Sequence, residues 1–505
     1  MNGGETLPAA RANILFALLF LASAALLGLQ IDEAFVGRHE GWNAAVYGVA
    51  ARAHLEYGLG VSRLGVIVNG DSVPPAGFIW YTNHPPLLPL VLAASFAVFG
   101  EREWAARLVP ILFTLASLLL VWRIGVRLRG PAYGLLAAAI FALVPMNAFY
   151  GRMVNHEALV LAFVLAALHA YLRWRDREEA RWFVLSLAAL ALAMASGWPG
   201  YYMAGFLAAF HLIAERGRRR DRRVLLYPLL ALVSFGLFVL HVAWLRGGAG
   251  LEELAAQFLT RTSAHTADFT EAGAARFTWP GFVLLWAVRA WKLFTLPVLA
   301  AILFELWDSV RERGGPAARA RAVALLLLVF AVTHLLLFRQ GAWVHEFWGS
   351  YLSAPLALLA AGGVLGLAGG RAAPRIIAFF LLLLAVAAAP RIRALHASDD
   401  TRILAFSRLA AEHARPGELI ATNEGFVKPQ VAWYARRDPI ETPLWTPSAL
   451  ADTLRSRGRP VAFFLLEGEP ESEALEGWLA PRYPAVADSV AGQRYQIYHV
   501  PGGTP

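Results

Sequence analysis

The stretch that decides the fold joins NILFALLFLASAALLGL at 13–29 to GRHEGWNAAVYGVAARAHLEYG at 37–58. The first part is apolar and nearly long enough to cross a bilayer. The second begins with charges and continues with apolar residues at three-to-four spacing, which predicts an amphipathic helix. The first part could pass for a signal peptide, but the later spans need it for their orientation, so we predict a retained helix. The predicted apolar stripe consists of Val46, Tyr47, Ala50, Ala53 and Tyr57.

The composition places the whole chain in a membrane. Of 505 residues, 58% are hydrophobic and only 16% are charged, whereas a soluble protein is about 25% charged. The net charge of +9 comes from arginine clusters in short loops, as at 215–223. Such clusters are typical of cytoplasmic loops and give no basis for nucleic-acid binding. The absence of cysteine excludes disulfides, thiolate zinc sites and cysteine nucleophiles.

Arginine placement also predicts the topology. The apolar run at about 86–100 is short, and if it crossed the bilayer four arginine-rich loops would fall outside. We therefore predict an interfacial or re-entrant helix there, eleven spans, an internal N-terminus and an external C-terminus. The predicted spans are 12–30, 104–122, 132–150, 157–174, 182–196, 199–214, 224–244, 281–306, 322–338, 351–369 and 374–389.

The predicted domains are a membrane module at 1–389, with a first external loop at 31–103, and an external domain at 390–505. In the tail, strand-like runs alternate with helix-like runs, which predicts a small α/β domain. We expect it to shape acceptor access and to perform no chemistry. The predicted strands are ELIAT (418–422), PVAFFLL (460–466) and RYQIYHV (494–500), and the predicted helices are 401–414, 447–457 and 471–480.

Three His-Glu pairs lie at the ends of apolar segments that this topology places on the external side. Ionisable groups near lipid are costly unless they line a cavity or perform chemistry, so the pairs predict an external enzyme site. Each has a simpler alternative. With Asn43 as the N-cap of the amphipathic helix, the first acid only favours a helix N-terminus, and the second acid follows a cap at Asn155 or His156. The pairs are His39-Glu40, His156-Glu157 and His345-Glu346.

Other candidate residues accompany these pairs. His84 precedes two prolines where the chain enters the interface, and Arg152 lies close to the second pair. Arg339 stands with His345 and Glu346 among aromatic residues that otherwise resemble a membrane belt. Lys292 falls inside a span, where it either binds phosphate or extends its amine to the interface.

The His-Glu pairs also fit a divalent metal, but they lack HExxH-type spacing, so metal binding is the minority interpretation. The sequence contains no Walker loop, GxSxG elbow or GxGxxG after a strand. Nucleotide-driven transport and serine hydrolysis therefore lose their usual support.

With these motifs in order, the chain resembles bacterial GT-C glycosyltransferases of the protein O-mannosyltransferase and aminoarabinose-transferase type. The resemblance covers about 31–390: acids after the first span, a helix ending in Tyr57-Gly58, HPPL at 84–87, FGEREWAARL at 99–108, and an acid within GRMVNHEAL at 151–159. It implies a polytopic α-helical fold with first-loop helices, and sugar transfer from a polyprenyl-phosphate donor outside the membrane.

The resemblance implies catalytic roles for Glu40 and Glu157, and places His84 where related sequences carry a basic residue facing the donor phosphate. The family pattern has Asp-Glu directly before the amphipathic helix, whereas Asp32-Glu33 here stands earlier. Asp32 and Glu33 therefore remain alternatives to Glu40. Further residues expected to bind substrate are His39, Asn43, Arg152, His156, Lys292, Arg339, His345 and Glu346.

We therefore expect a bacterial plasma-membrane glycosyltransferase that acts on a hydroxyl acceptor. A carboxylate would serve as general base, and basic groups would hold the departing phosphate. Two alternatives remain. A flippase for lipid-linked sugars would show broken helices and repeat symmetry, and a non-catalytic envelope assembly protein would need fewer spans.

Overall fold

The computed structural model describes residues 8–36, 38–214, 221–263, 277–311, 315–368, 373–397, 401–422, 428–440 and 458–502. The chain forms two compact units. Unit 1 comprises 1–31, 82–88 and 107–397, and unit 2 comprises 32–81, 89–106 and 398–505.

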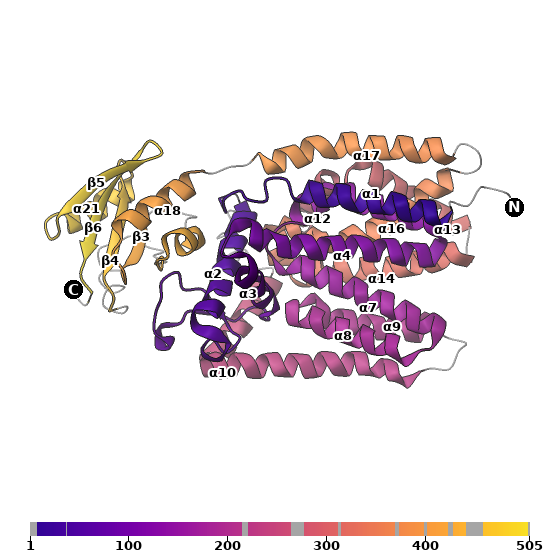
Figure 1. Ribbon diagram of the computed structural model, residues 1–505, viewed down its shortest axis with the longest axis horizontal. Helices are drawn as coiled ribbons and strands as arrows, with labels where there is room; N and C mark the ends of the chain where they lie inside the picture. Colours follow the sequence, from indigo (N-terminus) through magenta and orange to yellow (C-terminus); the bar gives the residue numbers. More distant parts are fainter. Residues whose placement is uncertain are drawn as a thin grey trace. The chain divides into compact units, whose positions relative to one another are not determined.

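Unit 1 is a helical bundle whose long helices run along a common direction (Figure 1). Its elements, with α4 beginning in unit 2, are α1 (Ala9–Leu27), α4 (Glu103–Arg129), α5 (Pro131–Leu143), α6 (Pro145–Tyr150), α7 (His156–Arg177), α8 (Ala180–Ser196), α9 (Pro199–Ala214), η2 (Arg222–Leu225), α10 (Leu226–Thr262), α12 (Trp279–Phe294), α13 (Leu296–Arg311), α14 (Gly315–Leu337), α15 (Arg339–Val344), η3 (Glu346–Leu352), α16 (Ser353–Leu367) and α17 (Ala373–His396).

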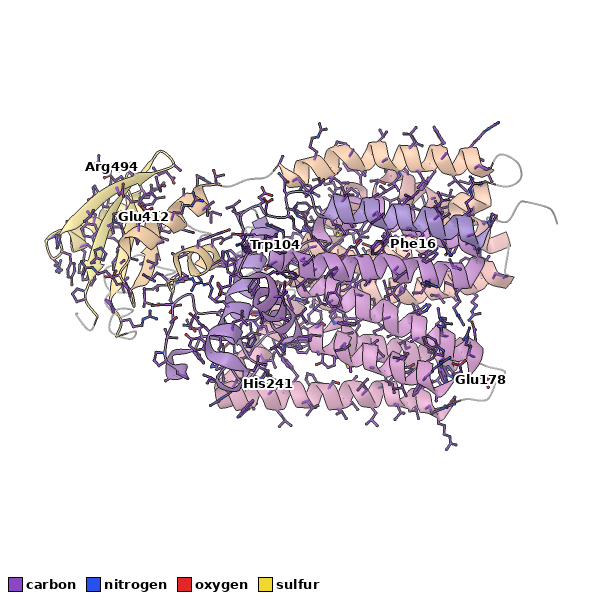
Figure 2. All side chains as sticks on the ribbon, viewed as in Figure 1. Phe16, Trp104, Glu178, His241, Glu412 and Arg494 are labelled. Carbon is purple, nitrogen blue, oxygen red and sulfur yellow. The ribbon has the colours of Figure 1, made fainter. Side chains whose placement is uncertain are left out.

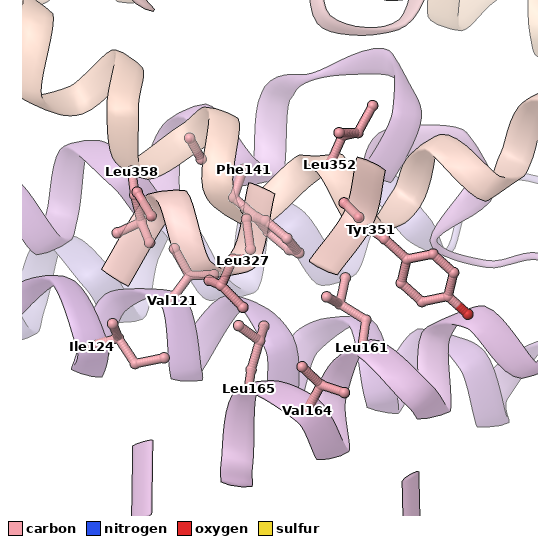
Figure 3. Packing of buried hydrophobic residues seen from close by; sticks show 14 of the residues in the cluster. Val121, Ile124, Phe141, Leu161, Val164, Leu165, Leu327, Tyr351, Leu352 and Leu358 are labelled. Carbon is pink, nitrogen blue, oxygen red and sulfur yellow. The ribbon is translucent and has the colours of Figure 1, made fainter. Parts of the chain in front are cut away.

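Leucine, alanine and phenylalanine supply the core of this bundle because most of its helices are apolar on all sides. Figure 3 shows side chains of α4, α5, α7, α14 and α16 meeting there, with Leu165 of α7 and Leu327 of α14 among them. At another contact, Phe16 of α1 (labelled in Figure 2) stacks on Trp122, with 4.0 Å between ring centroids and 8° between ring planes.

The outer helices present leucine where a soluble protein would present charge. In α10 and α17 only 17% and 11% of the most apolar window is buried. An uncovered apolar surface of this extent fits lipid rather than water. Exposed side chains of α10 include Leu229, Leu232, Leu237 and Leu240.

Among the described residues, seven helices are long and apolar enough to cross a membrane, or eight if one bent pair is counted as a span. The predicted polytopic helical fold is confirmed, while the number eleven stays a prediction. The span predicted at 281–306 is bent in its middle, because α12 and α13 meet at 107°. Thr295 between them has a φ of 71°, and Pro297 lacks the N–H that would continue the first helix.

Unit 2 joins the first-loop helices to the C-terminal sheet. Its first-loop elements are α2 (Arg38–Val61), β1 (Val66–Ile67), η1 (Pro75–Gly77), β2 (Trp80–Tyr81) and α3 (Leu87–Phe99), the last beginning in unit 1. Its C-terminal elements are α18 (Thr401–His413), β3 (Leu419–Thr422), α19 (Lys428–Gln430), η5 (Val431–Ala435), β4 (Val461–Leu466), α21 (Pro470–Leu479), β5 (Ala485–Val490) and β6 (Gln493–Val500).

The first-loop predictions hold in part. The amphipathic helix exists as α2, and Tyr47, Ala50 and Ala53 of its predicted stripe are buried. The helix α3 has 13 residues, about 20 Å at 1.5 Å per residue, which is short of a bilayer core of about 30 Å. This length supports the prediction that 86–100 does not cross.

The tail is a small α/β structure, as predicted. The sheet has the order β3-β4-β6-β5, with β3 parallel to β4 and the other pairs antiparallel. The three predicted strands and the helices at 401–414 and 471–480 are confirmed, β5 was missed, and the helix predicted at 447–457 lies outside the described residues. The helix α17 continues to His396, and the boundary at 390 stays a prediction.

Candidate active site

Glu157 owes its place to the sequence directly before it. Asn155 has an extended backbone and its side-chain oxygen accepts a hydrogen bond from the His156 N–H at 2.9 Å, which starts α7. Glu157 then lies in the first turn, where the partial positive charge of a helix N-terminus favours a carboxylate. Its exposed fraction is 5%, and the side chain of Trp348 lies close enough to interact with its carboxylate.

One imidazole stands beside this carboxylate, and a second lies beside the first. His156 Nε2 lies 3.3 Å from Glu157 Oε1, and the rings of His156 and His84 are 4.1 Å apart between centroids. Asn83 holds the His84 stretch in place, because its carbonyl accepts a hydrogen bond from Trp198 Nε1 at 2.9 Å. At Gly197, a Cβ would lie 3.0 Å from His156 Cδ2, so the SGW turn at 196–198 allows this close approach.

The surroundings of His84 favour its neutral form. Burial, followed by the nearby His156 and the guanidinium of Arg261, holds the pKa of His84 well below its ordinary value. A neutral imidazole donates and accepts hydrogen bonds but brings no fixed charge. His84 is therefore suited to orienting a substrate oxygen near neutral pH, rather than to acting as a permanent cation.

The third predicted segment packs into the same unit around Trp348. The ring of Trp348 lies 4.5 Å from His334 and 5.3 Å from His345 between centroids. His334 Nδ1 in turn lies 2.6 Å from the Tyr202 hydroxyl. A Cβ at Gly341 would lie 2.0 Å from Trp348, so only glycine lets α15 approach this ring.

Several cations of unit 1 hold backbone. Arg152 donates to the Leu29 carbonyl, and Arg107 donates to the Ile31 carbonyl at 3.1 Å, so both secure the end of α1. Arg289 donates to the carbonyls of Ala342 and Trp343 at 2.6 and 2.9 Å. These contacts give the predicted binding residue Arg152 a structural task.

A small cavity adjoins Glu157. Its volume is about 20 Å³, which is room for one water-sized molecule. Tyr150 also lines it, and its hydroxyl donates to Glu346. Its other lining residues are Thr114, Ser117, Phe141, Asn147, Gly151, Met153, Asn155, Ala158, Leu161, Phe347 and Ser350.

Glu40 lies in unit 2, with an exposed fraction of 7% and a place in the first turn of α2. The prediction of Asn43 as N-cap is wrong, because α2 begins at Arg38 and Asn43 lies inside the helix. Asp32 is exposed and Glu33 half-buried, and both precede α2. Burial and helix position favour Glu40 over these alternatives.

The remaining predicted residues are less enclosed. Lys292 is exposed on α12, and His39 and His345 are half-buried. The guanidinium of the half-buried Arg339 lies 6.0 Å from the Trp279 ring centroid, which fits a residue of an aromatic belt. Within the described ranges, no group of three or more His, Asp or Glu residues could hold a metal ion.

The structure adds residues that sequence reasoning missed. His334 and Tyr202 pair inside unit 1, and Arg261 donates to the Gln340 side chain at 2.7 Å near His84. His334 carried a usable signal, since a histidine inside an apolar span is a candidate for function by default. Tyr202 and Arg261 carried none, because their partners lie 132 and 79 positions away in sequence.

The chain is similar in sequence and in structure to known proteins. Residues 83–244 match the family model described as dolichyl-phosphate-mannose-protein mannosyltransferase. The structure matches ArnT from Cupriavidus metallidurans bound to undecaprenyl phosphate with a TM-score of 0.65 and 15% identity, covering 97% of this chain and 98% of that one. The chain has the GT-C fold.

Other relatives agree. The Archaeoglobus fulgidus oligosaccharyltransferase AglB, solved with an inhibitory peptide and a dolichol-phosphate, gives a TM-score of 0.57 at 14% identity, covering 90% of this chain and 69% of that one. The dolichyl-phosphooligosaccharide-protein glycotransferase 1 of A. fulgidus is 27% identical over 190 residues, 35% of this chain and 31% of the relative. The chain thus spans about a third of this curated relative. The predicted resemblance to GT-C glycosyltransferases is confirmed.

Proposed function

We propose that this GT-C protein transfers a sugar from a polyprenyl-phosphate donor to a hydroxyl acceptor. The observation that carries the proposal is the buried carboxylate of Glu157, which opens α7 beside His156 and His84. Burying a carboxylate in an apolar bundle is costly unless it has a task. The ligands named for structures of the same fold, undecaprenyl phosphate and dolichol-phosphate, support a lipid-phosphate donor.

The chemistry is a single displacement. The acceptor oxygen forms a bond to the anomeric carbon as the bond from that carbon to the phosphate oxygen breaks. A carboxylate takes the hydroxyl proton, and the polyprenyl phosphate leaves with the bonding electrons. Glu40 and Glu157 are the proposed carboxylates, and inversion at the anomeric carbon follows from attack opposite the leaving group.

Neighbouring groups hold the donor. His84, His156 and His345 orient donor oxygens, while Arg261 lies near enough to influence the charge of His84. A cation placed in advance stabilises a phosphate as its negative charge grows. Arg339 and Lys292 are more exposed and suit the outer path of the lipid phosphate.

The proposed location is a bacterial plasma membrane, with the N-terminus cytoplasmic and the C-terminal domain external. The arginine-rich loops support this orientation. A chain without cysteine allows single-cysteine labelling. Arg181→Cys, at an exposed position, should react only from the cytoplasmic side and Glu252→Cys only from outside; the reverse pattern would overturn the orientation.

The test is turnover by the purified full-length protein with a panel of polyprenyl-phosphate sugars. We expect release of free polyprenyl phosphate, which thin-layer chromatography or mass spectrometry detects. A parallel sample in EDTA, with Mg²⁺ or Mn²⁺ restored, tests the metal alternative. Movement of the donor from one leaflet of a liposome to the other, without release of polyprenyl phosphate, would instead indicate a flippase.

A further inference from the structure

We propose that Trp433 and Tyr434, in the C-terminal part of the chain, are positioning residues for the helix that carries Glu40. The catalytic meaning of this inference rests on the proposed function, but the contacts themselves do not. All the residues involved belong to unit 2. The tail would then complete the first loop rather than only select the acceptor.

Trp433 is the centre of the contact. Its exposed fraction is 6%, and its ring packs against the backbone of α2 at Gly48, where a Cβ would lie 2.8 Å from Cζ3. The ring centroid of Phe35 lies 5.4 Å away and that of Phe96 on α3 lies 5.8 Å away. The single indole ring of Trp433 therefore contacts α2, α3 and the segment that precedes α2.

Tyr434 fixes the same segment by hydrogen bonds. Its hydroxyl accepts from the Phe35 N–H at 2.7 Å and donates to Glu103 Oε1 at 2.9 Å. The Phe35 side chain has no exposed surface. A buried backbone N–H that loses its acceptor costs free energy, so this hydroxyl determines where Phe35 can lie.

Phe35 in turn lies against the residue that follows Glu40. A Cβ at Gly41 would approach the Phe35 carbonyl carbon and the Val36 nitrogen to 2.8 Å. The first turn of α2 thus packs directly on the backbone that Tyr434 holds. Moving Phe35 by a few tenths of an ångström moves the turn that carries Glu40, and catalytic geometry tolerates little misplacement.

Arg52 extends the clamp along α2. Its side chain donates to Glu101 Oε2 at 2.9 Å, to the Ala432 carbonyl at 3.2 Å and to the Trp433 carbonyl at 2.9 Å. Its guanidinium also lies 4.7 Å from the Trp433 ring centroid. Ala432 and Trp433 are thus tied to a buried arginine that lies about one turn after Gly48 on α2.

The test combines Trp433→Ala, Trp433→Phe and Tyr434→Phe in the full-length protein. Trp478→Ala is the matched control, since Trp478 packs in the core beside β4 rather than on α2. Hydrogen–deuterium exchange of the peptide 33–45 measures the contact without any substrate. We expect exchange of this peptide to quicken at least tenfold in Trp433→Ala and Tyr434→Phe, and to stay unchanged in Trp478→Ala.

Turnover adds the catalytic consequence. In Tyr434→Phe we expect kcat for release of polyprenyl phosphate to fall at least tenfold while KM for donor and acceptor stays within twofold. Release of polyprenyl phosphate with water as the only acceptor should fall by the same factor. Trp433→Phe should recover part of the activity that Trp433→Ala loses.

Two results would overturn the inference. Unchanged hydrogen–deuterium exchange of the peptide 33–45 in both Trp433→Ala and Tyr434→Phe would show that these two residues do not position the segment before Glu40. A change confined to KM for the acceptor would assign the tail to acceptor selection. If the wild-type protein releases no lipid phosphate from any donor, the proposed function fails, while the exchange experiment still decides the positioning.

Discussion

The two proposed catalytic acids occupy the same local position and are held there by different means. Glu157 and Glu40 each lie in the first turn of a helix, with exposed fractions of 5% and 7%. Glu157 follows its own helix cap at Asn155. The segment before Glu40 is instead fixed by a tyrosine 399 positions later in the chain.

Because of this difference, the two acids should respond differently to substitutions far away in the sequence. Near Glu157, the local sequence carries the helix start, and distant residues only supply neighbours. Near Glu40, the local sequence forms the helix, but the position of that helix depends on contacts with the tail. A truncation near Arg393, which removes the tail, is therefore expected to abolish release of polyprenyl phosphate even when water is the only acceptor. Survival of that reaction would show that α2 keeps its position without the tail.

The largest expected effect is loss of either acid. Glu157→Gln and Glu40→Gln should each lower the rate of transfer by about 10²–10⁴-fold, because a glutamine cannot accept the hydroxyl proton. Turnover of a polyprenyl-phosphate sugar measures this, with size-exclusion profiles to show that folding is kept.

Matched controls lie on the same helices. Glu178→Gln, at the opposite end of α7 (Figure 2), and Glu56→Gln, exposed on α2, should retain turnover. Loss of activity only in Asp32→Asn or Glu33→Gln would transfer the first-loop role to the earlier pair.

A buried carboxylate in the tail provides the next test of long-range support. Asp438 is 1% exposed and accepts hydrogen bonds from the Gly70 N–H at 2.7 Å and from Arg459 at 2.7 Å. Asp438→Ala should lower the stability of unit 2 by about 3–4 kcal/mol, because it leaves these donors without their acceptor. Limited proteolysis of the first loop measures this. Glu473→Ala, exposed on α21, is the control, and equal resistance of both variants would contradict the prediction.

Acid should weaken the same unit through His54 on α2. Its Nδ1 lies 2.9 Å from Ser62 Oγ, and burial lowers the pKa of His54 from 6.5 to about 4. The unfolded chain therefore binds the proton first, so stability is full above pH 6.5 and falls as the pH drops towards 4. At about 1.4 kcal/mol per pKa unit, the loss reaches about 3 kcal/mol.

Thermal unfolding between pH 7 and pH 4 checks this prediction. His54→Gln should reduce the acid sensitivity even though it changes stability at neutral pH. An unchanged slope in that variant would place the acid sensitivity elsewhere.

The smallest effect separates two glycines of α2. Gly41→Ala should destabilise unit 2 by about 1–3 kcal/mol, since the new methyl group meets the backbone of Phe35 and Val36. At Gly60 a Cβ would meet nothing within 4 Å, so Gly60→Ala should be neutral or slightly stabilising. Thermal midpoints compare them, and similar midpoints would mean that the contact at Gly41 relaxes without cost.

The sequence by itself determined the elements whose causes are local. Apolar length and arginine placement predicted the membrane fold, and strand-like runs predicted β3, β4 and β6. The Asn155 cap was among the predicted alternatives for the start of α7. These features depend on residues within one or two turns, or on alternation along one strand, which a linear pattern contains.

Only the tertiary structure decided the features whose causes are distant. It paired Tyr202 with His334, and joined Trp433 and Tyr434 to the segment before Glu40. Such contacts join residues separated by tens to hundreds of positions. Their geometry depends on how whole elements pack, and no periodicity in the sequence records which distant side chain fills a given space.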